Sequence, residues 1–200
     1  MDRRRSVRLT SFDYASPGAY FVTICTYDRR CLFGDVVDGD MRRNEVGAIV
    51  TSAIRATPAV RKEIRLDTWI VMPNHIHLIV WFVGRNDGSP HPVGADGNPP
   101  SGGMRSGQAH YHAPLRRQAR SLSSFVAGLK RISTMNIRRH LGIAADIWQR
   151  GYHEHVIRDD EELDALRSYV INNALKWEKD PEHPTSQGGE GALPCAPTGE

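Results

Sequence analysis

Two histidines stand two positions apart within residues 72–80 (MPNHIHLIV). In a β-strand, successive side chains point to opposite faces, so His75 and His77 would share one face with Ile79 and Trp81. The other face would carry only apolar side chains and would suit a hydrophobic core. At about 3.3 Å per residue, the two Cα atoms would lie roughly 7 Å apart, which lets both imidazoles reach one metal ion. Two exposed or hydrogen-bonded histidines near a turn also explain the pattern, and the short motif alone favours that simpler interpretation.

A tyrosine and an amide later in the chain could complete such a site. Tyr169 and Asn173 are four residues apart, so on a helix they project from the same side. Beside them runs an apolar stripe that would face the core, formed by Leu163, Leu166, Val170 and Ala174. A phenol and an amide facing two histidines would combine a nucleophile with metal ligands. A tyrosine that packs its ring between helix and sheet, with its hydroxyl in water, explains the same spacing.

The elements that must position these residues follow from the hydrophobic periodicity. The predicted strands are residues 18–26, 66–72, 75–83 and the end of 147–157. The predicted helices are residues 43–62, 120–141 and a last helix that runs from about residue 160 towards residue 177. Asp159 can cap the last helix, with Glu162 three residues on, and Pro73-Asn74 forms the tight turn of an antiparallel hairpin. The order β-α-β-β-α-β-α predicts an α+β fold: a ferredoxin-like sandwich with helices packed on one face of an antiparallel sheet.

The composition indicates one domain, residues 1–180, interrupted and followed by segments of low complexity. Residues 84–118 are rich in Gly, Pro, Ser and His and hold almost no aliphatic residues, so we expect a flexible insert. Residues 181–200 are rich in Gly, Pro, Ser and Glu, which predicts a disordered tail.

Positive charge is concentrated in two parts of the chain. Arginines cluster at the start, and residues 105–140 contain seven arginines and one lysine but no acidic residue. A solvated helix face explains a short run of this kind, but an acid-free stretch of this length favours contact with the phosphates of nucleic acid. The candidate DNA-binding residues are Arg3, Arg4, Arg5, Lys130, Arg131, Arg138 and Arg139.

Three motifs in this order resemble the REP-associated tyrosine transposases, relatives of the IS200-like single-tyrosine transposases of the HUH superfamily. They are residues 73–77 (PNHIH), 148–155 (WQRGYHEH) and 169–173 (YVINN). The resemblance covers about residues 10–178, apart from the insert. It implies a ferredoxin-like fold and cleavage of single-stranded DNA at or near imperfect palindromic hairpins. One departure is Asn173-Ala174, where the family commonly has Asn-Pro.

Carried over residue by residue, the resemblance implies that His75, His77 and Asn173 bind Mg²⁺ or Mn²⁺. Tyr169 would attack the scissile phosphate and form a 5′-phosphotyrosine. The predicted function is therefore a metal-dependent enzyme that nicks and rejoins single-stranded DNA hairpins, acting as a monomer or a homodimer. Two alternatives stay open: a non-catalytic binder of structured nucleic acid on the same scaffold, and an unrelated metal-dependent hydrolase that uses the two histidines.

The location expected from the sequence is the bacterial cytoplasm, with nucleoid association when the protein is bound to DNA. No apolar run reaches the roughly 18 residues of a membrane span, and the basic start is not followed by the apolar core of a secretory signal. The three cysteines show no CxxC spacing, so we expect neither a disulfide framework nor a cysteine zinc site.

Overall fold

The structure, a computed structural model, describes residues 17–83 and 121–184. Arg3, Arg4 and Arg5 and the insert expected at residues 84–118 lie outside the described residues, as does the expected tail from residue 185 onwards.

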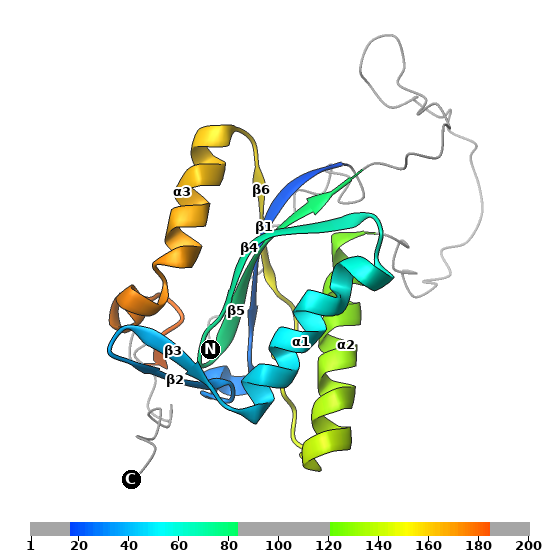
Figure 1. Ribbon diagram of the computed structural model, residues 1–200, viewed down its shortest axis with the longest axis vertical. Helices are drawn as coiled ribbons and strands as arrows, with labels where there is room; N and C mark the ends of the chain where they lie inside the picture. The colour runs from blue at the N-terminus through cyan, green and yellow to red at the C-terminus, as the bar shows by residue number, and fades with distance from the viewer. Residues whose placement is uncertain (1–16, 84–120, 185–200) are drawn as a thin grey trace, which may run out of the picture.

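A four-stranded antiparallel sheet forms the centre of the described part (Figure 1). Its strands are β1 (Gly18–Cys25), β4 (Ile64–Val71), β5 (His75–Phe82) and β6 (His153–Ile157). They lie in the order β4-β5-β1-β6, and each neighbouring pair is antiparallel. This is the strand order of a ferredoxin-like sheet, so the predicted fold class is confirmed.

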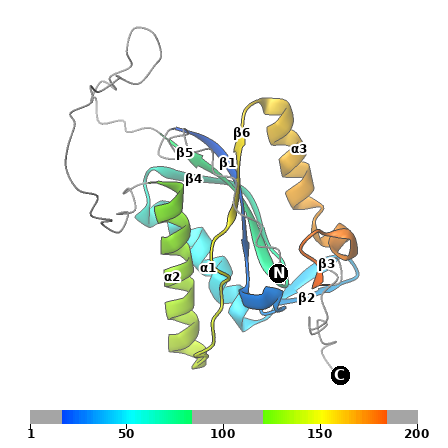
Figure 2. The same cartoon turned by 180° about the vertical axis from the view of Figure 1, so that it is seen from behind.

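The three long helices lie on the two faces of this sheet (Figures 1 and 2). They are α1 (Glu45–Val60), α2 (Leu122–Leu141) and α3 (Asp160–Ile171). Helices α1 and α2 cover the face that carries Ile76 and Leu78, and together they enclose the main core. Helix α3 packs on the opposite face, where Leu163 and Val170 meet Ile79. The prediction that helices pack on one face therefore holds for α1 and α2, whereas α3 covers the histidine face.

The ends of α3 show why its length differs from the prediction. Asp159 caps the start as expected, because its side chain accepts a hydrogen bond from the Glu162 amide at 2.8 Å. The helix ends at Ile171, since the Asn172 amide bonds the carbonyls of both Ser168 and Val170 and tightens the last turn. The chain continues as a 3₁₀ turn, η2 (Ala174–Lys179), which leads it back to the sheet.

A second, two-stranded sheet was not predicted. It consists of β2 (Gly34–Val37) and β3 (Asp40–Arg43), which lie in a stretch where the sequence predicted no strand. Asp38 and Gly39 join the strands with positive φ angles of 55° and 80°, the conformation for which Asp-Gly is a hairpin signal. Side chains of this hairpin pack with Trp177 of η2, so it supports the segment that returns to the sheet.

Two further expectations concern the cysteines and the membrane. Among the described residues, Cys25 is a buried free thiol. Within residues 17–83 and 121–184, no helix is long and apolar enough to cross a membrane.

Candidate active site

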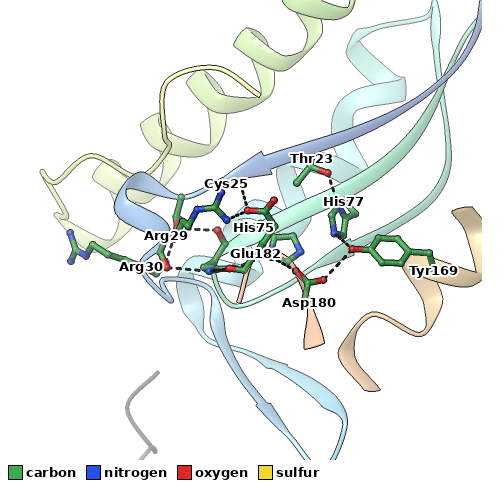
Figure 3. A network of polar contacts seen from close by, with 11 residues as sticks. Thr23, Cys25, Arg29, Arg30, His75, His77, Tyr169, Asp180 and Glu182 are labelled. Carbon is green, nitrogen blue, oxygen red and sulfur yellow. Dashed lines mark hydrogen bonds and ion pairs between the residues drawn. The ribbon is translucent and has the colours of Figure 1, made fainter. Parts of the chain in front are cut away.

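Strand β5 presents both histidines to helix α3, and Tyr169 of α3 points towards them (Figure 3). His75 is fully buried and His77 is 2% exposed, and their ring centroids lie 4.4 Å apart. The Tyr169 hydroxyl lies 3.3 Å from Nε2 of His77. Residues separated by 92 positions are therefore in hydrogen-bond contact, because α3 folds back over the strand.

Asn173 lies at the same site, just beyond the end of α3. It is 1% exposed, and its Nδ2 donates a hydrogen bond to Oδ2 of Asp180 at 2.6 Å. Its Oδ1 is buried and has no hydrogen-bond partner among the described residues. Asn172 does not reach the site, because its side chain donates back to the carbonyl of Ser168.

Asp180 is a member of the site that the sequence did not single out. One ligand atom each from His75, His77 and Asp180 lie within 4.8 Å of one another. The Tyr169 hydroxyl donates a hydrogen bond to Oδ2 of Asp180 at 3.2 Å. The residue follows the 3₁₀ turn η2, whose Trp177 is anchored beside His75, and no periodic pattern in the sequence marks it.

Residues 181–184 also pack at the site and are not part of a disordered tail. Glu182 is 8% exposed, and its carboxylate forms an ion pair with Arg29 and accepts a hydrogen bond from the Cys25 thiol at 3.5 Å (Figure 3). The chain after η2 therefore still has buried polar partners, since Glu182 contacts both Arg29 and Cys25.

Burial sets the protonation of the two histidines and of Tyr169. It lowers the pKa of His75 to about 3, and the positive charge of Arg29 adds to this effect. Burial, followed by the nearby His75, also holds the pKa of His77 well below its ordinary value, against the opposing charge of Asp180. Burial raises the pKa of the Tyr169 phenol well above its ordinary value, and the Asp180 carboxylate raises it further. At neutral pH both imidazoles are therefore uncharged, and the phenol keeps its proton.

The donor atoms fit a divalent metal ion. Nε2 of His75, like Oδ1 of Asn173, is buried without a hydrogen-bond partner in the described part of the chain. Buried polar atoms without partners are costly, so two of them in one site indicate a ligand. Two imidazole nitrogens with amide and carboxylate oxygens form a mixed set that suits Mn²⁺ and, with more of its ligands from water, Mg²⁺.

Helix α2, which carries the basic candidates, lies on the opposite face of the sheet from α3 (Figure 2), and these residues differ in their surroundings. Arg131, Arg138 and Arg139 are exposed. Lys130 instead donates hydrogen bonds to the carbonyls of Gln149, at 2.8 Å, and of Gly151. A groove of about 480 Å³ runs between α2 and residues 146–148, and Lys130, Arg131 and Arg138 contribute to its lining.

The chain is similar to a known bacterial protein in sequence and to a solved transposase structure in fold. No family model matches the chain. It is 33% identical over 178 residues to an uncharacterized protein of Haemophilus influenzae, a match that covers 88% of this chain and 91% of that protein. The solved structure of a REP-associated tyrosine transposase bound to a REP hairpin matches with a TM-score of 0.53 and 18% identity, over 100% of this chain and 93% of that one. This likeness agrees with the resemblance of the sequence motifs. The chain therefore belongs to one family with the Haemophilus influenzae protein and has the fold of a REP-associated tyrosine transposase.

Proposed function

We propose that this protein is a metal-dependent enzyme that nicks and rejoins single-stranded DNA at hairpins through a 5′-phosphotyrosine intermediate. One observation carries the proposal. The Tyr169 hydroxyl lies 3.3 Å from Nε2 of His77, and the same site holds two buried atoms, Nε2 of His75 and Oδ1 of Asn173, that lack hydrogen-bond partners among residues 17–83 and 121–184. A nucleophile in one site with candidate ligand atoms suits phosphoryl transfer better than it suits a purely structural role.

The proposed ligands are His75, His77 and Asn173, with Asp180 available as a fourth. A divalent ion held there, Mn²⁺ or Mg²⁺, would offset the negative charge of the phosphodiester and of the leaving oxygen. The protein supplies neutral imidazoles for this purpose, because burial keeps the pKa of both histidines below neutral pH.

Tyr169 supplies the nucleophile. Its oxygen would form a bond to the phosphorus while the bond from phosphorus to the 3′ oxygen breaks, which releases a 3′-hydroxyl after protonation. Asp180 already accepts the hydrogen bond of the phenol, so it is the group placed to take the phenolic proton. The phosphotyrosine conserves the energy of the broken bond, and attack by another 3′-hydroxyl can rejoin the strand without ATP.

The proposed partner is single-stranded DNA folded into hairpins. The REP-associated transposase of similar fold was solved bound to a REP hairpin. In the present chain the exposed Arg131, Arg138 and Arg139 offer contacts to phosphates, and Arg3, Arg4 and Arg5 are further candidates in a part that the structure does not describe. Lys130 is a weaker candidate for a phosphate contact, because its amine already donates hydrogen bonds to two backbone carbonyls.

The test uses end-labelled single-stranded hairpins made from palindromes that flank the gene, incubated with Mn²⁺ and separated under denaturing conditions. We expect a covalent protein–DNA adduct that Tyr169→Phe abolishes and that Tyr27→Phe retains. Tyr27 is a suitable control because its side chain is exposed outside the site.

Two other outcomes would replace the proposal. Hairpin binding without an adduct under every metal tested would favour a non-catalytic nucleic-acid binder. Released product without an adduct, retained in Tyr169→Phe but lost in His75→Ala, would indicate a hydrolase that uses water.

A further inference from the structure

The side chain of Asn74 is held in one orientation directly beside His75. Asn74 is fully buried, and its Nδ2 donates hydrogen bonds to the carbonyl of Glu182 at 2.7 Å and to that of Arg29 at 3.2 Å. Only the nitrogen of an amide side chain can donate to carbonyls, so two carbonyl partners determine which end of the amide faces them. The amide oxygen must therefore face the other way.

That oxygen, Oδ1, lies 2.9 Å from Nδ1 of His75. An amide oxygen can only accept a hydrogen bond, so Nδ1 must carry the proton. A neutral imidazole has one ring proton, and its other nitrogen then presents a lone pair. In His75 this other atom, Nε2, is the buried nitrogen without a partner among the described residues.

We infer that Asn74 is a positioning residue that holds His75 in the Nδ1-protonated tautomer and thereby directs the lone pair of Nε2 into the metal site. The inference rests on the metal site proposed above and concerns how the chain prepares it. Hydrogen-bond partners on the far side of a histidine ring orient the ligand and increase its basicity.

The partner of His77 differs in kind. Nδ1 of His77 lies 2.9 Å from the hydroxyl of Thr23, a group that can donate or accept. Thr23 therefore permits either tautomer of His77, whereas Asn74 permits one tautomer of His75. This difference makes Thr23→Val a matched control. The substitution removes a hydrogen bond to a histidine of the same site, but Thr23 does not determine which ring nitrogen of that histidine carries the proton.

The loop that supplies one of the two carbonyls has an unusual backbone. Asp28 and Arg29 both have positive φ angles, 50° and 52°, in the left-handed region that residues other than glycine seldom adopt. Strain of this kind persists where the surroundings enforce it. The Arg29 carbonyl is one of the two groups that orient Asn74, so the loop contributes to fixing the amide.

The test measures the tautomer directly in the full-length protein. Histidine labelled with ¹⁵N is followed by two-bond ¹H–¹⁵N NMR correlation in EDTA, and the His75 signals are assigned by their loss in His75→Gln. We expect the Nδ1-protonated form in the wild type and in Thr23→Val, which leaves Asn74 in place. In Asn74→Leu we expect His75 to lose that preference.

Metal and DNA binding are measured on the same variants. Calorimetric titration with Mn²⁺ should show affinity about 10- to 100-fold lower in Asn74→Leu and a smaller loss in Thr23→Val. Hairpin binding in EDTA should stay at the wild-type level in both variants, which a merely unfolded variant would not achieve.

An Nε2-protonated His75 in the wild type would overturn the inference, and this measurement requires no variant to fold. Unchanged Mn²⁺ affinity in a folded Asn74→Leu would also overturn it. Failure of the proposed function has a different signature, namely normal Mn²⁺ binding and the expected tautomer in a wild-type protein that forms no covalent adduct.

Discussion

Helix α3 carries two polar networks that differ in how completely their atoms are paired. Arg167 reaches across to Asp67 of β4, with Nε 2.9 Å from Oδ1 and Nη2 2.6 Å from Oδ2. The indole of Trp81 donates to the same carboxylate at 3.0 Å, and Asp164 accepts a further bond from Arg167. Both oxygens of Asp67 therefore accept hydrogen bonds, from the guanidinium of Arg167 and the indole of Trp81, which is the arrangement of a structural ion pair.

The second network begins two residues later and is left incomplete. The Tyr169 hydroxyl contacts both His77 and Asp180, but Nε2 of His75 and Oδ1 of Asn173 stay without hydrogen-bond partners in the described chain. Both networks join the same helix to the same sheet. In the network around Asp67 the carboxylate oxygens have donors, as expected of polar groups that stabilise the fold. In the network around Tyr169 two buried atoms lack hydrogen-bond partners in the described chain, as expected where we propose that a ligand binds.

The largest expected effect is stabilisation by metal. With free Mn²⁺ at about 100 times its dissociation constant, the free energy of unfolding should rise by about 2.7 kcal/mol, because the ion binds the folded state. His77→Ala should abolish this increase, and His155→Ala, which alters a histidine paired with Glu162 outside the site, should retain it. Urea unfolding with and without Mn²⁺ measures both. An equal increase in His77→Ala would show that the incomplete network does not bind the ion.

Loss of the complete network should act on stability alone. Arg167→Met should lower the free energy of unfolding by about 1–2 kcal/mol, since it leaves the Asp67 carboxylate, 12% exposed, with fewer donors. Asp164→Asn is the matched control and should cost less than about 0.5 kcal/mol, because the Asp164 side chain is 74% exposed. The Mn²⁺-induced increase in the free energy of unfolding should persist in both variants. Loss of that increase in Arg167→Met would show that the Asp67 network and the proposed metal site are coupled.

Acid should weaken the complete network in a defined range. The hydrogen bonds from Arg167 hold the pKa of Asp67 well below its ordinary value, so the folded protein binds this proton less readily than the unfolded chain. The stabilisation is complete above the unfolded pKa of about 3.9 and is lost as the pH falls below it, by at most about 1.4 kcal/mol per pH unit. Urea unfolding between pH 6 and pH 2.5, as the difference between wild type and Asp67→Asn, isolates this contribution. A stability difference between wild type and Asp67→Asn that does not change with pH would contradict this prediction.

The smallest expected effect concerns the basic face of α2. Arg139→Gln should reduce the salt dependence of hairpin binding by about 0.7–1 in the slope of log K against log [salt], the loss of one phosphate contact. Lys130→Gln should leave that slope unchanged and instead lower stability, because Lys130 holds the carbonyls of Gln149 and Gly151. Fluorescence anisotropy across a salt series measures the slopes. A reduced slope in Lys130→Gln would return this residue to the DNA-binding set.

The positions of the strands and helices could be predicted because they depend on neighbours in sequence. Alternation around His75 and His77 predicted β5, and the cap at Asp159 predicted the start of α3. The hairpin β2–β3 was missed although Asp38-Gly39 carried a local signal for it. The placement of α3 on the histidine face could not be read from the chain, because that face also carries Ile79 and Trp81, so both faces of β5 offer apolar residues on which a helix can pack.

By itself, the sequence determined the residue types, their order and their periodicity: two histidines on one strand face, a tyrosine and an amide one helical turn apart, and the motifs that resemble a transposase family. Only the tertiary structure decided which atoms meet. It brought Asp180 and Glu182 to the site, joined Asp67 to Arg167 across 100 residues, and oriented Asn74 by carbonyls from two distant segments. The physical reason is that periodicity is a local property of the chain. The pairing of a buried donor or acceptor depends on every segment that packs around it.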